Sequence, residues 1–159
     1  MALLRLLLTF LLLTGVSAAT ATAETSRNLG WSELSSSRGA TVDFPGGLFT
    51  KEVADEKRGR LFFSTADGTG RFELFSIENT RGENPMQFAR RTVNGERLSY
   101  KRVTGNFIAA STSKDGRILY RRCNFSRGMI HCVDIRYPAS EERAWDDIVT
   151  RISLSLRPR

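Results

Sequence analysis

The residues best suited to chemistry lie close together in the sequence, because both cysteines and the only histidine fall between Arg117 and Tyr137. A thiolate or an imidazole can act as nucleophile, general base or metal ligand. A zinc site needs more histidines or thiols than the chain offers, and a redox-active pair is usually Cys-x-x-Cys, a closer spacing than that of Cys123 and Cys132. The remaining possibilities are a structural disulfide, two free thiols, and a hydrolytic use of His131.

A disulfide between Cys123 and Cys132 would fix the pairing of two strands. In an antiparallel ladder, the numbers of opposed residues have a constant sum. The pairings that follow are Arg121 with Asp134, Tyr120 with Ile135 and Ile118 with Tyr137. These are one charge pair and two aromatic or β-branched pairs, which stabilise neighbouring strands. The bond would close a loop of roughly ten residues and contribute on the order of 2–3 kcal/mol.

The same register assigns the side chains of this hairpin to two faces. One face carries Ile118, Tyr120, Val133, Ile135 and Tyr137. The other carries Leu119, Arg121, Cys123, Cys132 and Asp134. The first is predicted to be the core face, but Ile108 and Ala110 of the preceding strand share a face with the cysteines. Both faces of the sheet are therefore expected to be partly covered.

His131 is predicted to pack at the edge of the core, since its register position puts it on the same face as Val133. A Ser-His-acid triad would have to use this histidine, yet the serines around it lie in turn-like sequences without a nucleophile-elbow pattern. We therefore expect no catalytic residue, no metal site and no cofactor. The alternative is a small secreted hydrolase that uses His131.

Arginines gather around the predicted hairpin and the strands before it. The candidates for an anion-binding site are Arg102, Arg121, Arg122, Arg127 and Arg136. Guanidinium groups bind carboxylate and phosphate through paired hydrogen bonds, so these residues would form an anion site if they met on one surface. The alternative is dispersed solubilising charge, partly neutralised by Asp134, in a chain of formal net charge +7. No nucleic-acid motif with interleaved aromatic residues accompanies them, so no specific nucleic-acid partner is expected.

The N-terminus has the order of a secretion signal. Arg5 precedes the apolar run Leu6–Leu13, and a tract of small residues follows. This order predicts a signal peptide over residues 1–23, with cleavage after Ala18 or Ala21 as alternatives. The run is too short for a permanent membrane span, and no transmembrane segment is expected in the mature chain. We expect a periplasmic or secreted protein, in an oxidising compartment that agrees with the disulfide.

One α+β domain is predicted over residues 24–159. Its strands are expected at Thr41–Phe44, Arg60–Thr65, Arg71–Ile77, Leu98–Thr104, Phe107–Ser113, Arg117–Asn124 and Met129–Tyr137. The last four form a continuous meander, because Gly105-Asn106 and Asp115-Gly116 suit tight hairpin turns. Lys51–Arg60 is expected to be a charged loop, and Glu24–Arg38 a short helix or an ordered arm.

Two helices are predicted. The first covers Asn84–Thr92, where Pro85 suits a first helical position. The second begins with Ser140 as its cap. Its apolar residues recur with helical spacing and are Trp145, Ile148, Val149 and Ile152, extended by Leu156. This stripe is expected to lie on the sheet.

Several short motifs carry a resemblance to known proteins. They are Val42–Pro45, Asp67-Gly68 with Arg71-Phe72, Tyr120–Cys123, Ile130–Cys132, Tyr137-Pro138 and Trp145–Leu156. On these motifs the chain resembles a set of small, uncharacterised secreted proteins of alphaproteobacteria, and its layout is remotely similar to the PsbP/Mog-type fold. That resemblance implies an α/β/α sandwich, in which helices pack on an antiparallel sheet of about six to seven strands. Known members of the fold mostly act as non-enzymatic binding or assembly factors, with partners as different as a photosystem and a nuclear GTPase.

Taken together, these expectations describe a basic, monomeric domain that binds without catalysis. The partner would be an unknown macromolecule or anion of the cell envelope, because the chain is predicted to be exported and carries excess positive charge. The resemblance carries over no binding residue, so the arginines named above are the only candidates for the contact.

Overall fold

The computed structural model of the chain describes residues 29–55, 59–93 and 97–159, and the predicted signal peptide lies outside these ranges. The strands are β1 (Trp31–Ser35), β2 (Ala40–Pro45), β3 (Phe49–Asp55), β4 (Arg60–Thr65), β5 (Arg71–Glu78), β6 (Leu98–Val103), β7 (Phe107–Lys114), β8 (Arg117–Ser126), β9 (Met129–Pro138) and β10 (Arg157–Pro158). The helices are α1 (Pro85–Thr92) and α2 (Glu142–Ser155), the latter preceded by a 3-10 turn at Ala139–Glu141. Within the described part of the chain, neither helix is long and apolar enough to cross a membrane.

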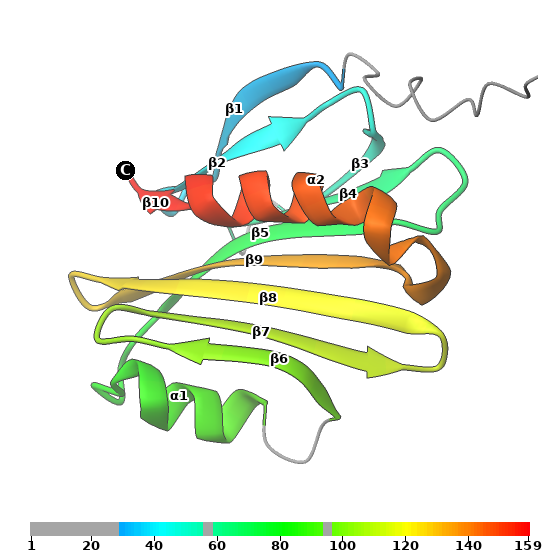
Figure 1. Cartoon of the computed structure of the whole chain (residues 1–159). Coiled ribbons are helices and arrows are strands. Elements are labelled where there is room, and N and C mark those ends of the chain that lie inside the picture. Colours follow the sequence, from blue (N-terminus) through cyan, green and yellow to red (C-terminus); the bar gives the residue numbers. More distant parts are fainter. Residues whose placement is uncertain (1–28, 56–58, 94–96) are drawn as a thin grey trace, which may run out of the picture.

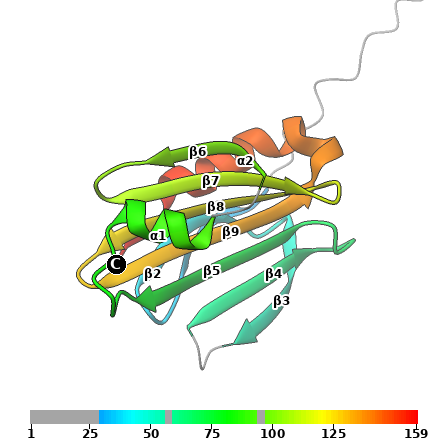
Figure 2. The ribbon, with the colours of Figure 1, turned by 90° about the horizontal axis from the view of Figure 1, so that it is seen from below.

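The middle layer is a seven-stranded antiparallel sheet in the order β3-β4-β5-β9-β8-β7-β6. Helix α2 lies on one face of this sheet (Figure 1), and α1 lies on the other (Figure 2). A second, three-stranded sheet in the order β1-β2-β10 packs beside α2 through β2. The predicted α/β/α sandwich and its meander from β6 to β9 are confirmed. The small second sheet was not predicted.

The central hairpin of β8 and β9 has the predicted register throughout. Cys123 lies opposite Cys132, and the three pairings derived from them are all present. The two cysteines form a disulfide, with a Cα–Cα distance of 4.1 Å and a sequence separation of 9 residues. Both sulfur-bearing residues are fully buried. The disulfide therefore lies inside the sandwich, on the α1 face of the sheet.

Helix α2 packs against the sheet through its predicted stripe. Trp145, Val149, Ile152 and Leu156 are buried, and Ile148 is partly buried against the same core. The indole of Trp145 stacks on the ring of Tyr137, with 5.1 Å between ring centroids. The predicted cap is wrong: Ser140 lies in the 3-10 turn, and Glu141 precedes the helix without a side-chain capping bond.

Helix α1 begins as predicted and covers the disulfide side of the sheet. The side chains of Asn84 and Gln87 each bond the other's backbone, which forms a capping box at the start of the helix. Phe88 and Ala89 are buried in the core cluster that contains both cysteines. Two separate cores thus cover the two faces of the sheet, as expected from the mixed pattern of its strands.

Two predicted segments differ from the structure. Glu24–Arg38 is predicted to be a short helix or an ordered arm. The helix is wrong for Trp31–Ser35, which is a strand paired with β2, and residues 24–28 lie outside the described ranges. The predicted charged loop Lys51–Arg60 is wrong at both ends, because β3 continues to Asp55 and β4 begins at Arg60; residues 56–58 of it lie outside the described ranges. Since β3 is an edge strand, it tolerates the charged residues that made this segment look like a loop.

Candidate functional site

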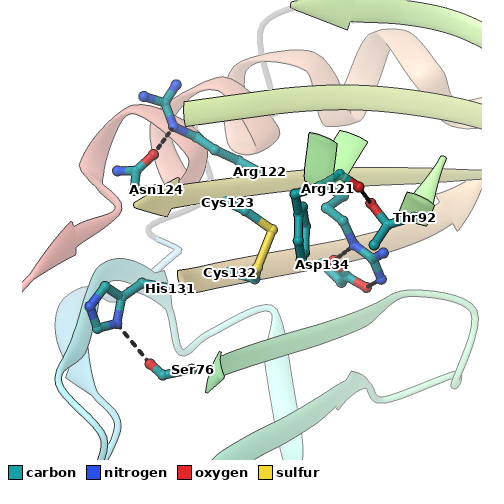
Figure 3. The surroundings of a disulfide bond; sticks show 10 residues. Ser76, Thr92, Arg121, Arg122, Cys123, Asn124, His131, Cys132 and Asp134 are labelled. Carbon is teal, nitrogen blue, oxygen red and sulfur yellow. Dashed lines mark hydrogen bonds and ion pairs between the residues drawn. A yellow bond between two sulfur atoms is a disulfide. The ribbon is translucent and has the colours of Figure 1, made fainter. Parts of the chain in front are cut away.

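The structure separates the five candidate arginines. Arg121 extends over the disulfide face, where its Nε and Nη2 donate to the two carboxylate oxygens of Asp134 at 2.7 and 2.5 Å (Figure 3). Asp134 is buried, so this bidentate ion pair neutralises a carboxylate inside the fold. Arg121 therefore serves the scaffold.

Two further candidates lie away from Arg102 and Arg122. Arg127 is exposed in the β8–β9 turn and has a φ of 48°. Arg136 is exposed on the α1 face, opposite Leu119 on one neighbouring strand and Arg71 on the other. The five candidates therefore do not meet on one surface.

The remaining two, Arg102 and Arg122, come together on the α2 face. Each lies opposite Ala109, one on β6 and one on β8, so the two arginines flank the same small residue of β7. Both guanidinium groups lie over the ring of Phe107, at 5.6 Å for Arg102 and 4.1 Å for Arg122. In the described part of the chain neither arginine forms an ion pair with a carboxylate.

Arg122 is held in place by the end of α2. Its Nε donates to Oδ1 of Asn124 at 3.1 Å, and the Asn124 amide nitrogen donates to the carbonyl of Leu156 at 2.7 Å. Burial lowers the pKa of Arg122 below its ordinary value, and the charge of Arg102 lowers it further. The side chain stays protonated, so the site holds a partly desolvated positive charge.

A second row of side chains runs beside the arginines. Tyr100 and Tyr120 lie opposite Ser111, so two aromatic residues again flank a small residue of β7. The hydroxyl of Tyr120 is 2.6 Å from that of Ser153 on α2, and burial raises the pKa of Tyr120. The two rows together make a trough with a floor of small residues and walls of tyrosine and arginine.

The trough opens into a groove beside α2, which we call the α2 groove. It has a volume of about 420 Å³ and lies between α2 and the strands β6, β7, β8 and β9. Its lining consists of Ser99, Tyr100, Arg102, Phe107, Ala109, Ser111, Tyr120, Arg122, Tyr137, Glu142, Asp146, Val149, Thr150, Ser153 and Leu154. The groove exists because α2 contacts β8, β9 and β2 but leaves the outer part of the sheet beside it (Figure 1).

The α2 groove has opposite charges at its two ends. Glu142 and Asp146 line it near the start of α2, while Arg102 and Arg122 lie near the end of the helix. Burial, together with the charges of Glu142 and Asp146, raises the pKa of Tyr137 to about 12. An anionic ligand is therefore attracted to the arginine end and repelled from the other.

His131 lies outside this groove and is buried, as predicted. Its Nδ1 is 2.8 Å from the hydroxyl of Ser76, which is also buried (Figure 3). The approach to the ring is closed by the β1–β2 turn, where a Cβ on Gly39 would lie 3.9 Å from Cε1. No carboxylate of the described residues bonds this imidazole, so a Ser-His-acid triad is not assembled there. The same residues contain no group of three or more potential metal-ligating side chains.

Sequence reasoning missed the aromatic members of the site, Tyr100, Tyr120 and Phe107. A register shift between Leu98 and Tyr100, as at a β-bulge, explains one of them. Before the shift, Leu98 lies opposite Thr112 and faces the α1 side of the sheet. After it, Tyr100 lies opposite Ser111 and faces the α2 side. The bulge also turns Arg102 into the groove. The sequence signal for the trough-like site was the pair of small residues, Ala109 and Ser111, on the intervening strand β7.

Comparisons with known proteins define the fold. No protein-family model and no curated protein matches this chain in sequence. An antiparallel sheet between two helices, as described above, is a PsbP-like α+β fold. The solution structure of cyanobacterial PsbP (CyanoP) from Synechocystis sp. PCC 6803 matches with a TM-score of 0.59 and 11% identity, over 81% of this chain and 92% of that chain. LpqN from Mycobacterium tuberculosis, described as involved in cell envelope biogenesis, gives a TM-score of 0.44 and 12% identity over 80% and 91%.

The likeness to CyanoP confirms the remote resemblance to PsbP-type proteins at the level of the fold. It carries no ligand or partner to this chain. The narrower resemblance to secreted alphaproteobacterial proteins stays a prediction.

Proposed function

We propose that this protein is an exported, non-enzymatic binding domain whose α2 groove takes an anionic group of an envelope partner. The anion would lie between Arg102 and Arg122. A buried disulfide is typical of an oxidising compartment, which supports export together with the N-terminal pattern. The burial of His131 against Ser76 keeps the only imidazole away from any substrate, which supports binding rather than catalysis.

The observation that carries the proposal is the position of the two guanidinium groups over one ring. Arg102 and Arg122 repel each other, and Arg122 is partly desolvated, yet no described carboxylate neutralises them. A carboxylate or phosphate between them would accept hydrogen bonds from both and remove the repulsion. Phe107 orients both groups and leaves their outer N–H donors free for such a ligand.

Affinity capture from an envelope extract tests the proposal. The immobilised protein should retain an anionic component at low ionic strength and release it at high ionic strength, because salt screens the attraction. Arg122→Gln should reduce retention strongly, since the neutral amide keeps polar contacts but loses the charge. Arg127→Gln removes one charge from the β8–β9 turn and is the matched control, so it should change retention little.

Two results would contradict the proposal. Retention that is independent of salt would rule out an electrostatic site. Equal losses with Arg122→Gln and Arg127→Gln would show that net charge, rather than the α2 groove, attracts the partner.

A further inference from the structure

We infer that the ligand of the α2 groove is an amphiphilic anion, with a carboxylate or phosphate head at Arg102 and Arg122 and one hydrocarbon chain along the groove. This inference rests on the proposed function and adds the chemistry of the part of the ligand that does not touch the arginines.

The rims of the groove carry the two most exposed large apolar side chains in the described part of the chain. Leu154 of α2 is 71% exposed, and Tyr100 of β6 is 46% exposed. Single exposed apolar residues are ordinary on protein surfaces. These two, however, line one groove from opposite walls, directly beside the arginine pair. An apolar ligand between them would be covered on both sides.

The surface between the rims offers both carbon and polar atoms to a ligand, and two of its hydroxyls are already bonded within the protein. The hydroxyl of Ser99 donates to the carbonyl of Ser111, and the hydroxyl of Ser153 bonds Tyr120. Val149 and Ala109 complete the lining with aliphatic groups. A hydrocarbon chain laid over these two hydroxyls would leave neither without a partner, and it would bury the aliphatic and aromatic carbon of the lining.

The charges of the groove fix the direction in which the ligand's hydrocarbon chain lies. An anionic head is attracted to the arginine end, and Glu142 and Asp146 exclude it from the other. The helix rises by about 1.5 Å per residue, so the wall from Leu154 back to Asp146 is about 12 Å long. That length and a volume of about 420 Å³ suit one short or medium chain rather than a pair.

Titration with straight-chain acids tests this inference. Calorimetry would measure the affinity of hexanoate, octanoate and decanoate below their micelle concentrations, with octyl phosphate to compare head groups and octanol as the neutral analogue. Affinity should rise by up to about fourfold for each methylene, the ratio that corresponds to about 0.8 kcal/mol. Octanol should bind far more weakly than octanoate.

Variants separate the two parts of the ligand. Leu154→Ser should weaken the dependence on chain length, and it should fold normally because the side chain is mostly exposed. Met86→Ser alters another exposed apolar residue, 43% exposed and on α1, and should leave the dependence unchanged. Arg122→Gln should weaken all acids by a similar factor.

The outcomes distinguish this inference from the proposed function. If affinity does not change with chain length while Arg122→Gln still abolishes capture of the envelope component, the hydrocarbon chain is wrong and the anion site stands. If an acidic peptide binds and the alkyl acids and octyl phosphate do not, the amphiphile is also wrong. If octanol binds as tightly as octanoate, the charge contributes nothing and the proposed function fails with the inference.

Discussion

Arg102 and Arg122 lie on opposite sides of one alanine, on two strands that are not paired with each other, and their guanidinium groups cover the same phenyl ring. Two positive charges this close are unfavourable unless an anion joins them. Of the five arginines considered from the sequence, these are the two that share one aromatic ring. The strand register and the end of α2 hold this pair beside the α2 groove.

Asn124 sets the position of Arg122, so its replacement should alter binding in a defined way. In Asn124→Asp, a carboxylate would replace the amide oxygen that accepts from Arg122. This internal anion would compete with the ligand, and capture of the envelope component should weaken by roughly tenfold. Capture experiments at low ionic strength would measure the change.

The control for that variant is Asn124→Ala. Both variants lose the bond from the Asn124 amide to the Leu156 carbonyl, which should lower the free energy of unfolding by about 1 kcal/mol. Only the aspartate adds a charge. If the alanine variant loses as much binding as the aspartate variant, the lost contact to Arg122 rather than the added charge decides, and the predicted competition by the new carboxylate is wrong.

The disulfide should stabilise the fold by restricting the unfolded chain. Replacing Cys123 and Cys132 together by alanine should lower the free energy of unfolding by about 2–3 kcal/mol, the value for a loop of this length. Urea unfolding with and without a reductant measures this. The reductant should lower the stability of the natural protein to a similar extent and leave the double variant unchanged; an unchanged natural protein would argue against the bond.

Trp145 should be the most costly single truncation in α2. Its indole is 5% exposed and packs between Tyr137 and Phe49, so Trp145→Ala should reduce the free energy of unfolding by roughly 3–5 kcal/mol. Trp31→Ala is the control, since that indole is only partly buried and lies under the Arg151 guanidinium. Equal losses in urea unfolding would show that Trp145 does not anchor the helix.

His131 should make the fold less stable in weak acid. Burial lowers the pKa of His131 below its ordinary value of 6.5. The unfolded chain therefore binds a proton more readily than the folded one in the range between the two pKa values. The free energy of unfolding should fall as the pH is lowered from about 6.5 and stop falling below the pKa of the folded state.

His131→Gln isolates this effect because glutamine can still bond Ser76 but does not titrate here. Glu73 titrates in the opposite sense, since burial and the charge of Asp134 raise its pKa above 4.5, but it is present in both proteins. The difference in unfolding free energy between the two proteins, measured by urea at several pH values, should change only between the pKa of His131 in the folded protein and its pKa in the unfolded chain. A constant difference would show that His131 is not desolvated.

The part of the fold that follows from local rules was predictable. Once Cys123 and Cys132 were placed opposite each other, the period of two along a strand set the whole β8–β9 register. The spacing of Trp145 and Val149 likewise set the buried side of α2. These predictions needed no knowledge of distant contacts.

The binding groove was only partly predictable because it depends on distant contacts and on one irregularity. Arg102 and Arg122 were both candidates, but regular alternation in β6 puts Arg102 on the same face as Leu98. The bulge between Leu98 and Tyr100 reverses that assignment. Nor does the sequence show how far across the sheet α2 reaches, and this coverage decides which side chains line the groove.

The most direct test of the central claim is a titration observed at the arginine side chains themselves. Nuclear magnetic resonance of the Nε–H groups, assigned with Arg102→Lys and Arg122→Lys, would follow the protein as octyl phosphate is added. The signals of Arg102 and Arg122 should shift together and saturate, while those of Arg127 and Arg136 stay in place. Shifts of similar size at all four arginines, or larger ones at Arg127 or Arg136, would contradict an anion site in the α2 groove.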